Sequence, residues 1–205
     1  MDLAMFDGYW RSAVEARVDP VGVRLAKSGV TANALTAAGV VLAGCSAIAV
    51  GSGRLGLGFV LLVTAALPDL FDGPVAKATG PTTRRGAFFD STADRVTDSL
   101  LIGGVIWHLQ NDPNRHLSML GVAILAASWL VSYQRAKAES LGFDAKGGVM
   151  ERAERIVVLA FGLAIPSVLV AVLWLMLALT FATAVQRFIK VWRQASTQPD
   201  PTAAL

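Results

Sequence analysis

Long apolar segments separated by short polar turns dominate the chain. Each segment is close to the ~20 residues that a helix needs to cross the hydrocarbon core of a bilayer. Turn-forming residues lie between them, as in Gly51-Ser52-Gly53 and Asn111-Asp112-Pro113-Asn114. The pattern predicts an all-α membrane protein with six transmembrane helices, near residues 31–50, 55–78, 86–109, 116–140, 152–166 and 168–191.

The beginning of the chain has a different pattern, in which basic residues alternate with apolar ones. Helical spacing places the apolar residues on one side, which is typical of a helix that lies on a membrane surface. We therefore expect an amphipathic juxtamembrane helix over residues 1–28, with a solvated helical arm as the alternative. A six-helix transmembrane domain over 29–194 and a disordered tail over 195–205 complete the expected organisation.

Composition and charge agree with this reading. Of the 205 residues, 54% are hydrophobic and 16% are charged, which leaves too little polar surface for a soluble domain of this size. If the N-terminus is cytoplasmic, the outside turns hold only Arg54 and Arg115, whereas fifteen Lys and Arg residues lie on the cytoplasmic side. This bias predicts an even number of crossings, with both termini in the cytoplasm of a cell-membrane protein.

Five acids lie in or at the ends of apolar segments: Asp69, Asp72, Asp90, Asp94 and Asp98. A charge at the bilayer centre costs ~2.5–3.5 kcal/mol on insertion scales, so such acids are candidate functional residues. Asp69 and Asp72 are three residues apart and Asp90 and Asp94 are four apart, so each pair shares a helix face. Four carboxylates on two adjacent helices suit Mg²⁺ or Mn²⁺, and two ions would fit a phosphoryl substrate. Salt bridges to nearby arginines are the alternative.

The residues around these acids resemble a known signature. Residues 69–94 read DLFDGPVAKATGPTTRRGAFFDSTAD, which resembles the motif D-x2-D-G-x2-A-R-x8-G-x3-D-x3-D of the CDP-alcohol phosphotransferases. Seven positions match at the family spacing: Asp69, Asp72, Gly73, Ala76, Gly86, Asp90 and Asp94. Lys77 departs from the usual arginine, keeping the charge without the planar fork that binds phosphate.

The resemblance implies a transfer chemistry. Members of this family attack the phosphorus of a CDP-linked lipid with an alcohol and release CMP. By analogy Asp69, Asp72, Asp90 and Asp94 hold two divalent ions, and Asp94 is also the general base. The resemblance further implies a nucleotide site formed by Asn33, Asp69, Asp72, Gly73, Ala76, Lys77 and Gly86, in which Asn33 belongs to the family-like string Thr31–Thr36.

The acceptor site is expected among basic residues from three segments. Residues 132–139, 151–155 and 185–187 look like the bacterial phosphatidylinositol-phosphate synthase branch. The implied acceptor-binding residues are Ser132, Arg135, Arg152, Arg155 and Arg187. Arginine binds phosphate bidentately, so the cluster favours a phosphorylated alcohol as acceptor. The resemblance implies that this acceptor is inositol 1-phosphate, which receives the phosphatidyl group of CDP-diacylglycerol. The alternative for these residues is positive-inside bias with lipid headgroup contacts.

Two other functions stay open from the sequence. Glycerol 3-phosphate would also need a basic pocket and would give phosphatidylglycerol phosphate. A cation transporter would use intramembrane carboxylates in a different way, with acids near the midplane and a path to both sides. The resemblance also suggests a homodimer, for which Gly103, Gly104 and Gly121 could form a close helix contact.

Overall fold

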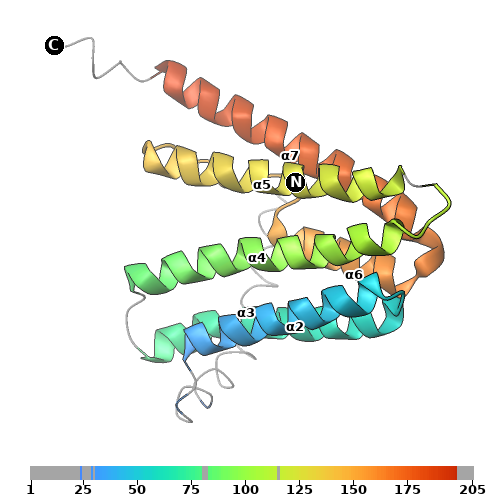
Figure 1. The fold of residues 1–205 in the computed structure, drawn as a ribbon. Coiled ribbons are helices and arrows are strands. Elements are labelled where there is room, and N and C mark those ends of the chain that lie inside the picture. Colours follow the sequence, from blue (N-terminus) through green and yellow to red (C-terminus); the bar gives the residue numbers. More distant parts are fainter. Residues whose placement is uncertain (1–23, 25–28, 30, 80–82, 115, 198–205) are drawn as a thin grey trace, which may run out of the picture. The chain divides into compact units, whose positions relative to one another are not determined.

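The computed structural model describes residues 24, 29, 31–79, 83–114 and 116–197, with side chains for all of these except 69–74 and 76–79. The regular elements in these ranges are helices: α2 (Ala32–Gly51), α3 (Leu55–Thr79), α4 (Arg84–Leu109), α5 (Leu117–Ser140), α6 (Arg152–Ala164), the 3₁₀ turn η1 (Pro166–Val168) and α7 (Leu169–Thr197) (Figure 1). The prediction of an all-helical fold is confirmed for this part of the chain. The expected helix over 1–28 and the tail beyond 197 lie outside the described residues.

The helix ends follow local hydrogen bonding. Thr31 Oγ1 accepts a bond from the N–H of Ala34 at 3.2 Å, and Thr83 Oγ1 accepts one from the N–H of Gly86 at 3.0 Å. Each threonine thus satisfies a backbone donor in the first turn, of α2 and α4 respectively. Helix α7 runs to Thr197, three residues past the expected domain end at 194. The hydroxyls of Ser196 and Thr197 bond to carbonyls of the preceding turn there.

Three helical stretches are long and apolar enough to cross a membrane: Ala32–Gly51, Leu117–Ser140 and Pro166–Thr197. A shorter apolar stretch covers Leu55–Pro68 of α3. Helix α6 has 13 residues and so rises only about 20 Å, less than the ~30 Å core of a bilayer. A membrane-integral protein is supported, whereas six crossings remain a prediction.

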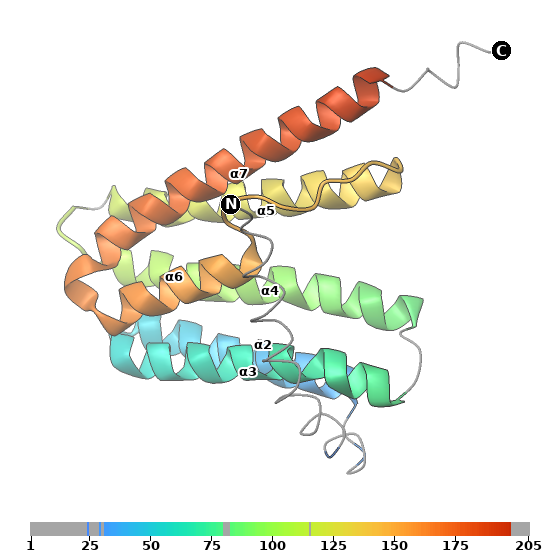
Figure 2. The same cartoon turned by 180° about the vertical axis from the view of Figure 1, so that it is seen from behind.

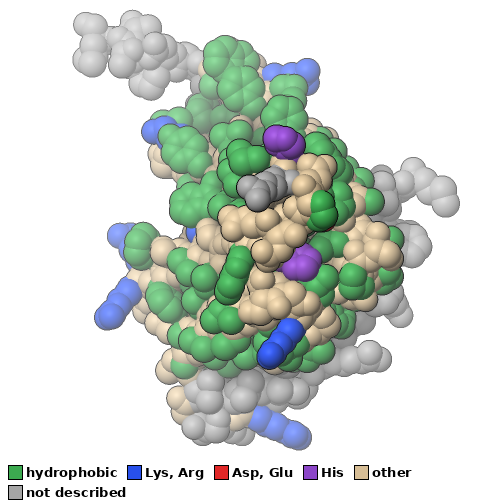
Figure 3. Space-filling model, turned by 45° about the vertical axis from the view of Figure 1, so that its right-hand side comes forward, with side chains coloured by type: hydrophobic (Ala, Val, Ile, Leu, Met, Phe, Trp, Pro, Cys, Tyr) green, Lys and Arg blue, Asp and Glu red, His purple; other side chains and the backbone are tan. Residues whose placement is uncertain are grey.

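Exposed apolar side chains fit a lipid environment. Trp174, Phe181 and Trp192 of α7 are more than half exposed, as is Val157 of α6. Hydrophobic side chains also spread over much of the face shown in Figure 3. In water such a surface would mark an interaction site or an aggregation hazard. Facing lipid, it is the expected exterior.

The helices divide between two compact units. The first contains the chain up to Ser46 together with Val60–Leu101, and the second contains Ala47–Phe59 and Ile102–Leu205. In the first unit, α2 and α3 approach closely at Gly39. A Cβ added there would lie 3.3 Å from the carbonyl oxygen of Ala65. The predicted aspartates all belong to this unit, and the predicted acceptor-binding residues all belong to the second.

In the second unit α7 packs against both α5 and α6 (Figure 2). Ile124, Leu163, Leu173 and Met176 fill this core, each no more than 2% exposed. Two of the glycines suggested for a dimer contact instead serve packing within the chain. A Cβ at Gly104 would lie 2.6 Å from the Ala47 backbone, and one at Gly121 would meet Ile106, so only Gly103 of the three faces open space.

Candidate active site

The carboxylates of the first unit lie on α3 and α4. Asp90 is exposed and Asp94, one turn further along α4, is partly buried. Asp98 follows after another turn and is 6% exposed. Since residues four apart share a helix face, Asp90, Asp94 and Asp98 form one acidic row. Asp69 and Asp72 lie in α3, with their side chains outside the described set.

Arg95, the residue after Asp94 on α4, contacts this acidic row. Its Nη2 lies 3.4 Å from Asp94 Oδ2, near the outer limit for a hydrogen bond, and both side chains keep about a quarter of their surface exposed. A contact of this length and exposure is weak. The contact with Arg95 alone therefore does not establish the salt-bridge alternative for Asp94.

The chemistry of these donors fits hard divalent cations. Asp90 and Asp94 offer accessible carboxylate oxygens one turn apart, the ligand type that Mg²⁺ and Mn²⁺ prefer. Among the described side chains, no group of three or more His, Cys, Asp or Glu is placed to hold a metal. Because Asp69 and Asp72 are not in that set, the four-carboxylate site stays a prediction.

Two of the predicted nucleotide-binding residues lie side by side. A Cβ added at Gly86 would come within 3.6 Å of Asn33 Oδ1 and 3.2 Å of Thr83 Oγ1. The start of α2 therefore meets the start of α4, with glycine where a larger residue would crowd the amide of Asn33. Gly73, Ala76 and Lys77 lie in α3 with undescribed side chains, so their predicted contacts with a nucleotide remain untested.

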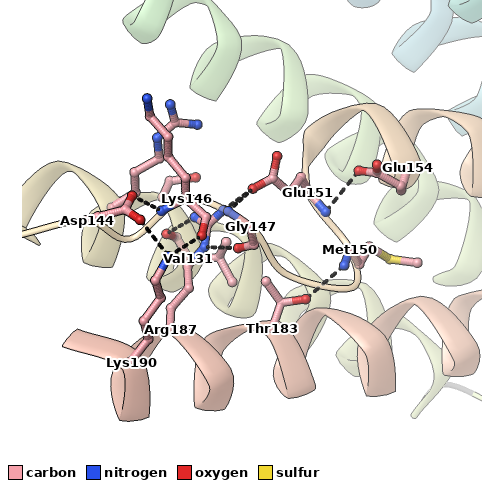
Figure 4. A network of polar contacts seen from close by, with 12 residues as sticks. Val131, Asp144, Lys146, Gly147, Met150, Glu151, Glu154, Thr183, Arg187 and Lys190 are labelled. Atoms are coloured by element: carbon pink, nitrogen blue, oxygen red, sulfur yellow. Dashed lines mark hydrogen bonds and ion pairs between the residues drawn. The ribbon is translucent and has the colours of Figure 1, made fainter. Parts of the chain in front are cut away.

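The second unit contains a network of polar contacts that includes Arg187, which is 4% exposed (Figure 4). Its guanidinium donates to the carbonyl oxygens of Gly147 and Val131, each at 3.0 Å, and to Glu151 Oε1 at 2.6 Å. Arg135 follows Val131 by one turn of α5, and Arg155 follows Glu151 by one turn of α6. These two arginines and Arg187 therefore form a basic cluster from three helices.

The other predicted acceptor-binding residues differ in burial. Arg152 and Arg155 lie in the first turn of α6, where Arg155 is 3% exposed. Arg135 is exposed and pairs with Glu139 at 2.9 Å, whereas the hydroxyl of Ser132 bonds back to the Ser128 carbonyl. Arg135 is therefore the member of the cluster that can most easily turn toward a solute.

The loop between α5 and α6, residues 141–151, is held against α7 by bonds that the sequence analysis did not anticipate. Lys190 donates to Asp144 Oδ2 at 2.7 Å, and Thr183 Oγ1 accepts from the N–H of Met150 at 2.9 Å. The Lys190 ammonium and the backbone N–H of Lys146 lower the pKa of the Asp144 carboxyl, which stays ionised at neutral pH.

Glu151 is the functional candidate that sequence reasoning missed. Its side chain forms a capping box with Glu154 at the start of α6, in addition to its bonds with Gly147 and Arg187. A capping box usually begins with Ser, Thr, Asp or Asn, so glutamate at position 151 does not complete the usual helix-start pattern with Glu154. No local pattern indicates the ion pair with Arg187, because 36 residues separate the partners.

Comparison with known proteins identifies the family of this chain. Residues 29–188 match the family model for CDP-alcohol phosphatidyltransferases. The chain belongs to this family. It is therefore a membrane-integral transferase, and the transporter alternative is wrong.

Two related proteins are similar to this chain over most of its length. The chain is 35% identical to the phosphatidylinositol phosphate synthase of Corynebacterium glutamicum, over 87% of this chain and 85% of the relative. It is 33% identical to the archaetidylinositol phosphate synthase of Methanothermobacter thermautotrophicus, over 90% and 93% respectively. The match therefore extends over nearly the whole of both proteins.

Solved structures of the Mycobacterium tuberculosis phosphatidylinositol phosphate synthase share the fold. The form with CDP-DAG bound is 29% identical, with a TM-score of 0.79 over 85% of this chain and 93% of that one. The form in complex with manganese and citrate has a TM-score of 0.80, also at 29% identity, over 85% and 88%.

Proposed function

We propose that this chain transfers the phosphatidyl group of CDP-diacylglycerol to inositol 1-phosphate, giving phosphatidylinositol phosphate and CMP. The observation that carries the proposal is the position of Arg187, bonded to Val131 of α5 and to Glu151 before α6, each one turn ahead of a second arginine, Arg135 or Arg155. A neutral alcohol would not require such a concentration of positive charge, whereas arginine forks match a phosphate. The names of the relatives favour inositol phosphate over glycerol 3-phosphate.

The aspartates act on the CDP-lipid in this proposal. Asp69, Asp72, Asp90 and Asp94 would hold two Mg²⁺ or Mn²⁺ ions, which polarise the diphosphate and stabilise the leaving CMP when bound. Asp94 would accept the proton of the acceptor hydroxyl as its oxygen attacks the phosphorus that bears the diacylglycerol. The new P–O bond forms as the bond to CMP breaks. The partial exposure of the Asp94 carboxylate supports this role, since a base must reach the hydroxyl that it deprotonates.

The nucleotide would be bound near the starts of α2 and α4. Asn33 would offer an amide to the CDP group, and Gly86 leaves the neighbouring backbone uncovered. On α3, Gly73 and Ala76 would let the nucleotide approach, and Lys77 would contact its phosphates as a point charge. These assignments rest on the match between residues 69–94 and the family motif.

The acceptor phosphate would be bound by Arg135, Arg152, Arg155 and Arg187, with Ser132 offering a hydroxyl. Three bonds occupy part of the Arg187 guanidinium, which has five N–H donors, so two remain for an anion. Arg187 would thus contribute a fixed fork and Arg135 a mobile one. Fixed donors bind at lower entropic cost because the protein has already ordered them.

We also infer a topology of six crossings with both termini and the active site cytoplasmic, an amphipathic helix over 1–28, and a homodimer in the cell membrane. The distribution of basic residues supports the orientation. Single cysteines in a Cys45→Ala background test it. Ser52→Cys should react only with a reagent added outside, and Lys137→Cys only with one added to the cytoplasmic face; the reverse pattern would contradict it.

The assay for the activity offers four acceptors separately to purified protein with CDP-diacylglycerol and Mg²⁺: inositol 1-phosphate, glycerol 3-phosphate, inositol and serine. CMP release is the readout. Release with inositol 1-phosphate well above the other three supports the proposal. Release with free inositol at the same rate would remove the reason for a phosphate-binding cluster.

A further inference from the structure

The α5–α6 loop, residues 141–151, runs back along the last part of α7. Asp144 contacts Lys190 and Gln194, and Met150 near the other end of the loop contacts Thr183. From Thr183 to Gln194, α7 rises about 16 Å. Figure 4 shows the loop bonded along this stretch. The irregular segment therefore lies beside Pro166–Thr197, one of the helical stretches long enough to cross a membrane.

One side of this loop is packed and the other is open. Ala145 and Met150 are at most 1% exposed, whereas Gly147 and Gly148 are exposed. The carbonyl oxygen of the exposed Gly147 accepts from the buried Arg187 guanidinium at 3.0 Å, so the open side of the loop adjoins this arginine.

Glu151 stands at the end of the loop and joins three elements. Its Oε1 accepts from the N–H of Gly147 at 3.1 Å and from Arg187 Nη2 at 2.6 Å. The same side chain caps the first turn of α6, which carries Arg152 and Arg155. The Glu151 carboxylate thus fixes the relative positions of the loop, the start of α6 and the buried guanidinium of Arg187.

The negative charge of Glu151 also stabilises the arginines around it. Arg187 experiences the like charges of Arg135 and Arg155, and Glu151 is the anion paired with it. The arginines would otherwise repel one another, and a buried guanidinium without a counter-charge is costly. Glu151 lets them remain close together before any anion binds.

We propose that Glu151 is a positioning residue for the acceptor: it holds Arg187 and the start of α6 so that their arginines face one phosphate beside the α5–α6 loop. The proposal rests on the proposed function. It assigns the surroundings of Arg187 to the phosphate of the acceptor alcohol and gives Glu151 no contact with the reacting atoms.

The test measures steady-state constants for both substrates in Glu151→Gln and Glu151→Ala. Glutamine keeps an oxygen for Gly147 and the helix cap but removes the charge, whereas alanine removes both. Asp144→Asn is the matched control, because it breaks the other ion pair between this loop and α7 without touching Arg187. Thermal unfolding of all three variants reports on stability.

We expect the KM for inositol 1-phosphate to rise severalfold in the Gln variant and at least about tenfold in the Ala variant, since a charge-assisted bond is lost. The KM for CDP-diacylglycerol should stay within about twofold, a split that loss of stability alone would not produce. Asp144→Asn should keep both constants near wild type even if its unfolding temperature falls.

Three results would overturn the proposal: an unchanged acceptor KM, an equal rise in both constants, or the same acceptor defect in Asp144→Asn. If the Ala variant cannot be purified, the Gln variant decides. Failure of the proposed function would look different, because wild-type protein would then not use inositol 1-phosphate at all. The Glu151 comparison could in that case be repeated with whichever acceptor the wild type uses.

Discussion

Glu151 and Arg187 form an ion pair of 2.6 Å in which the arginine side chain is 4% exposed and the glutamate 38%. The pair joins the segment before α6 to the middle of α7, and two backbone carbonyls accept from the same guanidinium. Removal of the arginine would leave those carbonyls and the carboxylate without their donor.

The first prediction concerns stability. Arg187→Gln should destabilise the protein by about 3 kcal/mol, because removing one member of a buried ion pair leaves the charge of the other, Glu151, uncompensated. Arg135→Gln should change stability by less than ~1 kcal/mol, since its pair with Glu139 is exposed. Unfolding of both variants in the same detergent checks this, and equal losses would contradict the buried role of Arg187.

The second prediction concerns the acceptor. Arg135→Gln should lower kcat/KM for inositol 1-phosphate about ten- to a hundredfold, because a charge-assisted contact contributes ~1.5–3 kcal/mol. Lys137→Gln, two residues further along α5 and also exposed, is the control for general loss of positive charge. If both variants weakened the acceptor alike, the arginines would be acting through bulk charge rather than through a pocket.

The third prediction concerns metal and base. Excess EDTA should abolish turnover and Mg²⁺ or Mn²⁺ should restore it.

Asp94→Asn should lose turnover while still binding the CDP-lipid, whereas Asp69→Asn and Asp72→Asn should weaken binding as well. Asp112→Asn, in the turn after α4, is the control. Full activity after chelation would contradict the metal site, and wild-type turnover in Asp94→Asn would contradict the role of Asp94 as base.

The fourth prediction concerns the fit of the α5–α6 loop against α7. Gly148 has φ of 145°, and a Cβ there would collide with Thr183 Cγ2. Gly148→Ala should therefore cost about 2–4 kcal/mol from backbone strain and overpacking together. Gly142 has φ of 81° in open space, so Gly142→Ala should cost only ~1–2 kcal/mol. Equal costs would mean that the loop is not held against α7.

Much of this fold could be predicted because apolar periodicity and turn residues are local signals. The ends of α2 and α5 agree with the expected segments to within one residue. Helix α7 extends further than expected because its last turns are polar yet still bonded, as with Gln194 to Asp144. The motif placed Asp90 and Asp94 on one face of α4 for the same local reason.

Other parts of the site could not be predicted, because they depend on contacts between distant residues. Arg187 was expected to face a ligand, yet three of its bonds go to the protein, across 36 to 56 residues of sequence. Gly104 and Gly121 suggested a contact between subunits, but residues of the same chain pack against both glycines. A pattern of small or basic residues shows that a close contact exists without showing its partner.

The fifth prediction concerns the choice between two phosphorylated acceptors. Wild-type protein is given CDP-diacylglycerol and Mg²⁺ with equal concentrations of inositol 1-phosphate and glycerol 3-phosphate in one reaction, and the lipid product is identified by mass spectrometry. The account predicts phosphatidylinositol phosphate as the dominant product. Predominant phosphatidylglycerol phosphate would contradict it.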